Sequence, residues 1–188
     1  LPRLPAPPTP QGALSPEDYA RPVEPWTDPS WLAVVKDWID SHLEELGLHP
    51  TGVVEQPHVR AWSTVLRIPT TGGDVWFKAN TPVLAHEAAV VALLAARRPD
   101  FVPELLAADV ERGWMLTADG GERLREVIER ERDLGRWLDV LPRYGRLQID
   151  MAEDSDRLVA LGLPDRRLAI LASDYEELIG RVDTMTDS

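Results

Sequence analysis

The chain has 188 residues, 44% of them hydrophobic, which is enough to build one core or two small lobes. A formal net charge of −12 disfavours nucleic acid and anionic membranes as partners, because both require a basic surface. The absence of cysteine excludes disulfides and thiolate metal sites, and agrees with a cytoplasmic location. Since no apolar run approaches the roughly 20 residues that span a bilayer, we expect no membrane association.

The N-terminal residues 1–27 are rich in proline and predict an extended or disordered tail. A ligand for a proline-binding module is a less favoured interpretation of the same segment. Asp28 and Pro29 then predict a helix N-cap and first turn, and the helix should end near Gly47. We expect its tryptophans to dock the helix on the core rather than to stack on a ligand; they are Trp26, Trp31 and Trp38.

The hydrophobic period changes after this helix. Strands are predicted over residues 53–55, 61–68, 75–79, 105–110 and 114–117, with a helix over residues 84–97. Gly72-Gly73 indicates a hairpin turn and not a phosphate-binding loop, because no helix follows it directly. The order of three strands, one helix and two strands predicts an α+β fold in which a five-stranded antiparallel sheet carries one packed helix.

The composition shifts at Asp119-Gly120-Gly121, after which the pattern is helical almost to the end. We therefore expect two parts after the tail. Residues 28–118 would form an N-terminal lobe with a leading helix, and residues 119–188 a hinge and the start of a helical lobe. The last helix is predicted to begin at Pro164.

Lys78 is one of only two lysines, and it stands at the end of an apolar strand. Glu87 follows at the start of the alanine-rich helix. A strand lysine that a helix glutamate orients is the arrangement by which kinases hold nucleotide phosphates. A plain structural ion pair is the alternative interpretation of these two residues.

Several short motifs, in this order, resemble those of aminoglycoside phosphotransferase-like kinases, which share the protein-kinase-like fold. They are Phe77-Lys78, the helix with Glu87, Val102-Pro103, and Trp114-Met115-Leu116-Thr117-Ala118-Asp119-Gly120. The resemblance implies that Lys78 contacts the α- and β-phosphates and that Glu87 pairs with it. It also implies that Met115 lies at the back of the nucleotide pocket, and that the Leu116 carbonyl and the Ala118 amide bind the purine edge.

The turn after the first strand, residues 56–64, has no glycine that would let backbone approach a phosphate closely. Ser63, with Thr64, is expected to donate hydrogen bonds there instead. The family's catalytic His-Gly-Asp motif is absent from the sequence. We therefore expect a fragment that ends before its catalytic loop and that is inactive by itself.

The resemblance implies an enzyme that transfers the γ-phosphoryl group of ATP, or GTP, to a hydroxyl of a small molecule, with Mg²⁺ as cofactor. The alternative is a non-catalytic, kinase-like scaffold that binds a nucleotide or a partner. An acidic cluster could attract a cationic substrate, although a solvated helix end is the simpler interpretation; its members are Asp150, Glu153, Asp154 and Asp156. The four histidines show no metal-ligand spacing.

Overall fold

The computed structural model describes residues 25–186, without the side chains of Leu178 and of residues 181–186. The predicted proline-rich tail lies almost entirely outside the described residues. Helix α2, Pro29–Glu45, begins as predicted: the Asp28 carboxylate accepts hydrogen bonds from the backbone N–H groups of Ser30, at 2.7 Å, and Trp31, at 3.2 Å. It ends before Gly47, which has a positive φ of 67°.

Five antiparallel strands form one sheet in the spatial order β1-β2-β3-β5-β4. They are β1 Glu55–Val59, β2 Ser63–Thr70, β3 Gly73–Asn80, β4 Leu105–Asp109 and β5 Trp114–Ala118. The predicted α+β class and five-stranded sheet are confirmed, as is the hairpin at Gly72-Gly73, where β2 turns into β3.

The first strand was predicted too early in the chain. Residues 53–55 were expected as strand and 56–64 as turn, whereas β1 runs from Glu55 to Val59 and only Arg60 to Trp62 connect it to β2. β1 is an edge strand with an irregular register between Glu55 and His58. An edge tolerates a proline such as Pro57, which hides the strand pattern in the sequence.

Helix α3, His86–Arg97, follows a single 3₁₀ turn. The remaining helices are α4 Leu124–Glu131, α5 Arg136–Asp150, α6 Ser155–Ala160 and α7 Leu168–Thr186. Helix α7 starts later than the predicted Pro164, because the Asp165 carboxylate accepts the N–H of Arg167 at 3.1 Å and forms a local turn there. No described helix is long and apolar enough to cross a membrane.

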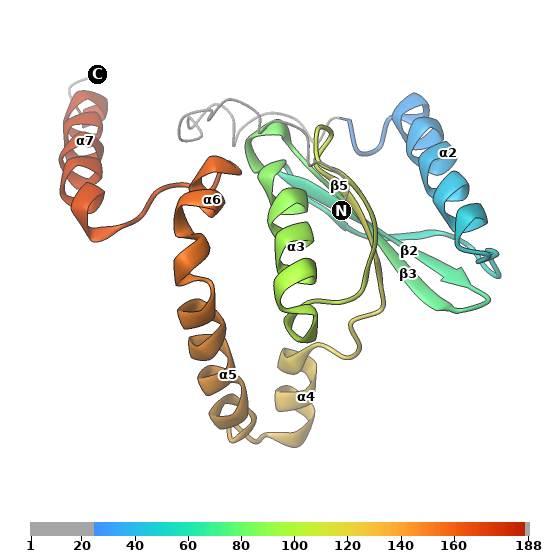
Figure 1. Cartoon of the computed structure of the whole chain (residues 1–188). Coiled ribbons are helices and arrows are strands. Elements are labelled where there is room, and N and C mark those ends of the chain that lie inside the picture. Colours follow the sequence, from blue (N-terminus) through green and yellow to red (C-terminus); the bar gives the residue numbers. More distant parts are fainter. Residues whose placement is uncertain (1–24, 187–188) are drawn as a thin grey trace.

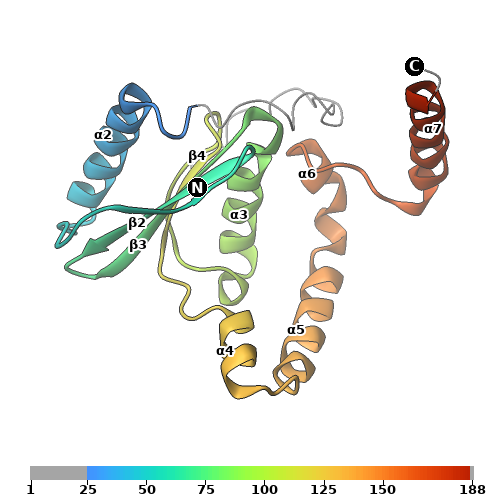
Figure 2. The ribbon, with the colours of Figure 1, turned by 180° about the vertical axis from the view of Figure 1, so that it is seen from behind.

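Helices α2 and α3 cover opposite faces of the sheet (Figures 1 and 2). The face under α2 contains the aromatic core, in which the ring centroids of Phe77 and Trp114 lie 5.7 Å apart. Trp38 packs on Phe77 at 5.8 Å, and Trp26 on Trp31 at 5.1 Å. The predicted docking role of these tryptophans is confirmed.

The helices from α4 onward extend beside α3 and away from the sheet, and α7 lies at the far end from α2 (Figures 1 and 2). No residue of α5 is buried. The ion pair from Arg97 at the end of α3 to the nearly buried Asp154, at 2.9 Å, ties this helical part to the sheet layer.

Candidate functional site

Of the residues that the sequence predicts for the site, Lys78, Met115 and Ser63 lie on the face of the sheet under α3. Lys78 on β3 lies directly opposite Val65 of β2 and Met115 of β5. Side chains alternate between the two faces of a strand. Trp76 and Asn80 therefore share the face of Lys78, whereas their odd-numbered neighbours belong to the core under α2.

Lys78 and Glu87 form the predicted pair. The Lys78 Nζ donates to both carboxylate oxygens of Glu87, at 2.5 and 2.7 Å. Asn80 donates through Nδ2 to Oε2 of Glu87 at 2.9 Å, so the carboxylate is held from two positions of β3. The Lys78 and Glu87 side chains are 32% and 37% exposed, so the pair is only partly buried.

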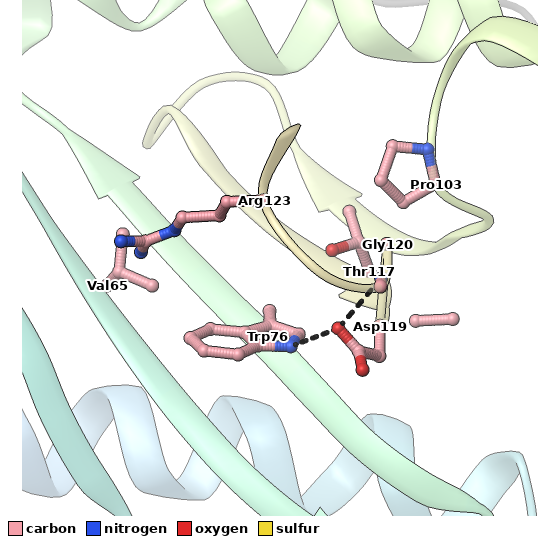
Figure 3. A pocket seen from close by; sticks show the side chains of 9 residues that line it. Val65, Trp76, Pro103, Thr117, Asp119, Gly120 and Arg123 are labelled. Atoms are coloured by element: carbon pink, nitrogen blue, oxygen red, sulfur yellow. Dashed lines mark hydrogen bonds between the residues drawn. The ribbon is translucent and has the colours of Figure 1, made fainter. Parts of the chain in front are cut away.

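An open pocket of about 210 Å³ lies on the same face of the sheet, and neither Lys78 nor Glu87 is among the residues that line it. Val65, which stands opposite Lys78, lines it together with Trp76 (Figure 3). The remaining lining residues are Pro103, the last two residues of β5, Thr117 and Ala118, and the segment after β5, namely Asp119, Gly120, Gly121 and Arg123. The pocket thus joins strands β2 and β3 to the segment that leads into α4.

Asp119 fixes one wall of the pocket (Figure 3). Its Oδ1 accepts the indole N–H of Trp76 at 3.1 Å and the backbone N–H of Gly121 at 3.2 Å. The first bond joins β3 to the connection after β5 and holds the tryptophan ring against the pocket. Trp76 is half-buried, and a flat aromatic surface of this kind can pack on a ring of a ligand.

Of the four other residues that were predicted for the site, three are buried and one lines the pocket. Met115 is buried beside Lys78, and Ser63, also buried, lies opposite Asn80. Leu116 directs its fully buried side chain into the core. Ala118 lines the pocket, but its amide already donates to the carbonyl of Glu104 at 2.9 Å.

Sequence reasoning missed Trp76, Asn80, Asp119 and Arg123 as site residues. Two of them could have been found, because residues two positions before and after Lys78 on a strand must share its face. The other two follow β5 in an irregular segment, for which the sequence gives no periodic signal.

The described residues contain no group of three acidic or histidine side chains arranged to hold a metal ion. The acidic cluster expected near the end of α5 is largely neutralised. Asp150 pairs with Arg98, Asp154 with Arg97 at 2.9 Å and Asp156 with Arg167 at 2.7 Å. The simpler interpretation was a solvated helix end, and it holds for the exposed Asp156, whereas Asp154 is buried in a structural ion pair.

No known protein-family model matches the chain, and no curated protein matches it in sequence. What can be said of its function therefore rests on the site itself.

Proposed function

We propose that this chain is the nucleotide-binding part of an ATP-dependent phosphotransferase of the aminoglycoside phosphotransferase-like type, with a protein-kinase-like fold. The observation that carries the proposal is the bidentate Lys78–Glu87 pair on the same face of the sheet as a pocket lined by Trp76 and the segment after β5. Strand lysine, helix glutamate and an interlobe slot are the parts that kinases use to place a nucleotide.

The pocket offers an apolar and aromatic site for the purine. Val65 and Trp76 supply the sheet side, and Pro103 the opposite side. Because the amides of Ala118 and Gly121 already donate to Glu104 and Asp119, we place the polar contacts of the purine at the backbone of Asp119 and Gly120 instead. This differs from the contact that the family resemblance implies.

Lys78 supplies a fixed positive charge for the phosphates, with Glu87 and Asn80 holding it in place. When bound, Mg²⁺ would neutralise further phosphate charge. The described residues do not fit a metal site of their own. The acceptor of the phosphoryl group is proposed to be a hydroxyl of a small molecule.

The test is calorimetric titration with Mg-ATP of the wild-type chain and of Lys78→Met. We expect Lys78→Met to weaken binding about tenfold or more, equivalent to about 1.4 kcal/mol, because the variant keeps the stem and loses the charge. Lys36→Met is the matched control. Lys36 is the other lysine, is exposed on α2 and pairs with Asp40, so its loss should leave ATP binding unchanged.

Circular dichroism would first establish that both variants are folded. No ATP binding by the folded wild-type chain, or equal binding by Lys78→Met and Lys36→Met, would contradict the proposal.

A further inference from the structure

A histidine that the sequence analysis set aside lies on the same face as Lys78. His58 of β1 pairs with Val65 of β2, and Val65 pairs with Lys78 of β3. The three side chains therefore form one row across the sheet. Since Val65 also lines the pocket, His58 stands near the outer end of the same site.

Arg123 approaches this row from the other side of the pocket. It precedes α4, and its guanidinium is drawn beside Val65 in Figure 3, with both residues lining the pocket. Its side chain is 73% exposed and has one loose ion pair, to Glu126 at 3.7 Å. His58 of β1, Lys78 of β3 and Arg123 before α4 thus lie in one region. This region gathers basic side chains although the chain has a net charge of −12.

The electrostatics around His58 are one-sided. Burial makes the largest contribution to lowering the pKa of His58, and the positive charges of Arg60, Lys78 and Arg123 lower this pKa further. The charges that act on the pKa of His58 are all positive, although Glu87 pairs with Lys78 and Glu126 lies 3.7 Å from Arg123. Asp119 is bonded to Trp76 and Gly121. An anionic ligand would relieve the repulsion among these cations.

The backbone that connects β1 to β2 is poorly suited to bind phosphate. It consists of Arg60, Ala61 and Trp62 and contains no glycine that would let main-chain N–H groups approach a phosphate. Charged side chains on either side of the pocket are the groups left to bind phosphate oxygens.

We propose that His58 and Arg123, together with Lys78, bind the polyphosphate of the nucleotide, and that His58 takes up a proton when the phosphates bind. This inference rests on the proposed nucleotide site and adds two binding residues and a pH dependence to it. The proton comes from solvent, and no covalent bond changes. A phosphate anion favours the imidazolium form, which the surrounding cations disfavour in the free protein.

In the free protein His58 is neutral near pH 7, because its pKa is lowered from the ordinary value of about 6.5. Bound phosphate raises that pKa. Nucleotide affinity should therefore increase as the pH falls through the raised pKa, and level off below the lowered pKa of the free protein.

The experiment is calorimetry with Mg-ATP at pH 7 in buffers of different ionisation enthalpy, which counts protons taken up per nucleotide. The variants are His58→Gln and Arg123→Gln. Matched controls are His49→Gln, an exposed histidine before β1, and Arg125→Gln, an exposed arginine of α4. AMP is titrated in parallel, since it offers far less phosphate.

The expected result is proton uptake by the wild type that His58→Gln abolishes. Each site variant should weaken ATP binding about tenfold and AMP binding much less, with both controls unchanged. ATP binding without proton uptake, or with His58→Gln equal to its control, would overturn this inference and leave the proposed function standing. No ATP binding by the folded wild-type chain would overturn both.

Discussion

At the scale of single residues, the Lys78–Glu87 pair is better placed for binding than for stability. Both side chains are about a third exposed, at 32% and 37%. Ion pairs with this much solvent contact contribute about 0–1 kcal/mol to folding. Asn80 differs, because it is 4% exposed and its Oδ1 is buried without a hydrogen-bond partner among the described residues. A buried oxygen without a hydrogen-bond partner lowers the stability of the fold. Here it belongs to the same side chain whose Nδ2 bonds the Glu87 carboxylate.

Asn80→Asp tests this environment. The new carboxylate would be buried, would lose the donor that now bonds Glu87 at 2.9 Å, and would face a like charge. We expect a loss of about 2 kcal/mol in the free energy of unfolding at pH 7.5, since an uncompensated buried charge is destabilising. The new carboxyl would have a raised pKa, so the loss should shrink as the pH falls toward 5 and the group protonates.

The measurement is urea unfolding of wild type and Asn80→Asp at both pH values. A difference in stability that is the same at pH 7.5 and pH 5 would show that charge is not its cause.

At the scale of elements, the site depends on how α3 is seated on the sheet. The turn from β4 to β5 ends at Gly113, which has a φ of 67°. A Cβ at this position would lie 2.7 Å from Cα and 2.8 Å from Cβ of Ala85, the residue immediately before α3. Glycine here lets the sheet approach the start of the helix that carries Glu87.

Gly113→Ala is therefore expected to destabilise the protein by about 3 kcal/mol, of which about 1 kcal/mol is backbone strain and the rest steric overlap. Gly47→Ala is a closely matched control. Gly47 has the same φ of 67°, but a Cβ there would meet nothing within 4 Å, so only the strain of about 1 kcal/mol should appear. Chemical denaturation of both variants checks the prediction, and equal losses would refute the role of close packing at Ala85.

At the scale of the whole molecule, the sheet layer and the helical part differ in how much they bury. Within the described residues the core is almost entirely sheet, α2 and α3, whereas α5 keeps large apolar side chains in solvent. Trp137 is 43% and Leu138 75% exposed. Elements with few buried contacts open at lower free energy than the core. Backbone amides of α5 should thus exchange with solvent faster than those of β3.

The contact between Arg97 and Asp154 links these two parts. Asp154→Ala removes it and should increase hydrogen exchange in α5 and α6 without changing exchange in β3. Asp156→Ala is the control, because Asp156 is an exposed residue that pairs with Arg167 within the helical part. Hydrogen exchange measured by mass spectrometry compares the variants. If Asp154→Ala also increased exchange in β3, or if it did not increase exchange in α5, the ion pair would not act as a local link between the two parts.

The sequence determined the elements and the central pair. The caps at Asp28, the periods of β2, β3 and α3, and the turn at Gly72 are local signals, so they could be recognised without a structure. The lysine and glutamate could be paired because a strand followed directly by its packing helix leaves few other arrangements. The prediction failed at β1, where edge pairing, and not local pattern, defines the strand.

Only the tertiary structure decided which side chains complete the site. Trp76 meets Asp119, forty-three residues further along the chain, because β3 and β5 are neighbours in the sheet. His58 joins the row of Lys78 through the register of two strand pairs, and a shift of one residue would turn it to the other face. The Ala118 amide was expected to bind the purine edge, and it is bonded to Glu104. These are long-range pairings, and the short motifs of one sequence do not specify them.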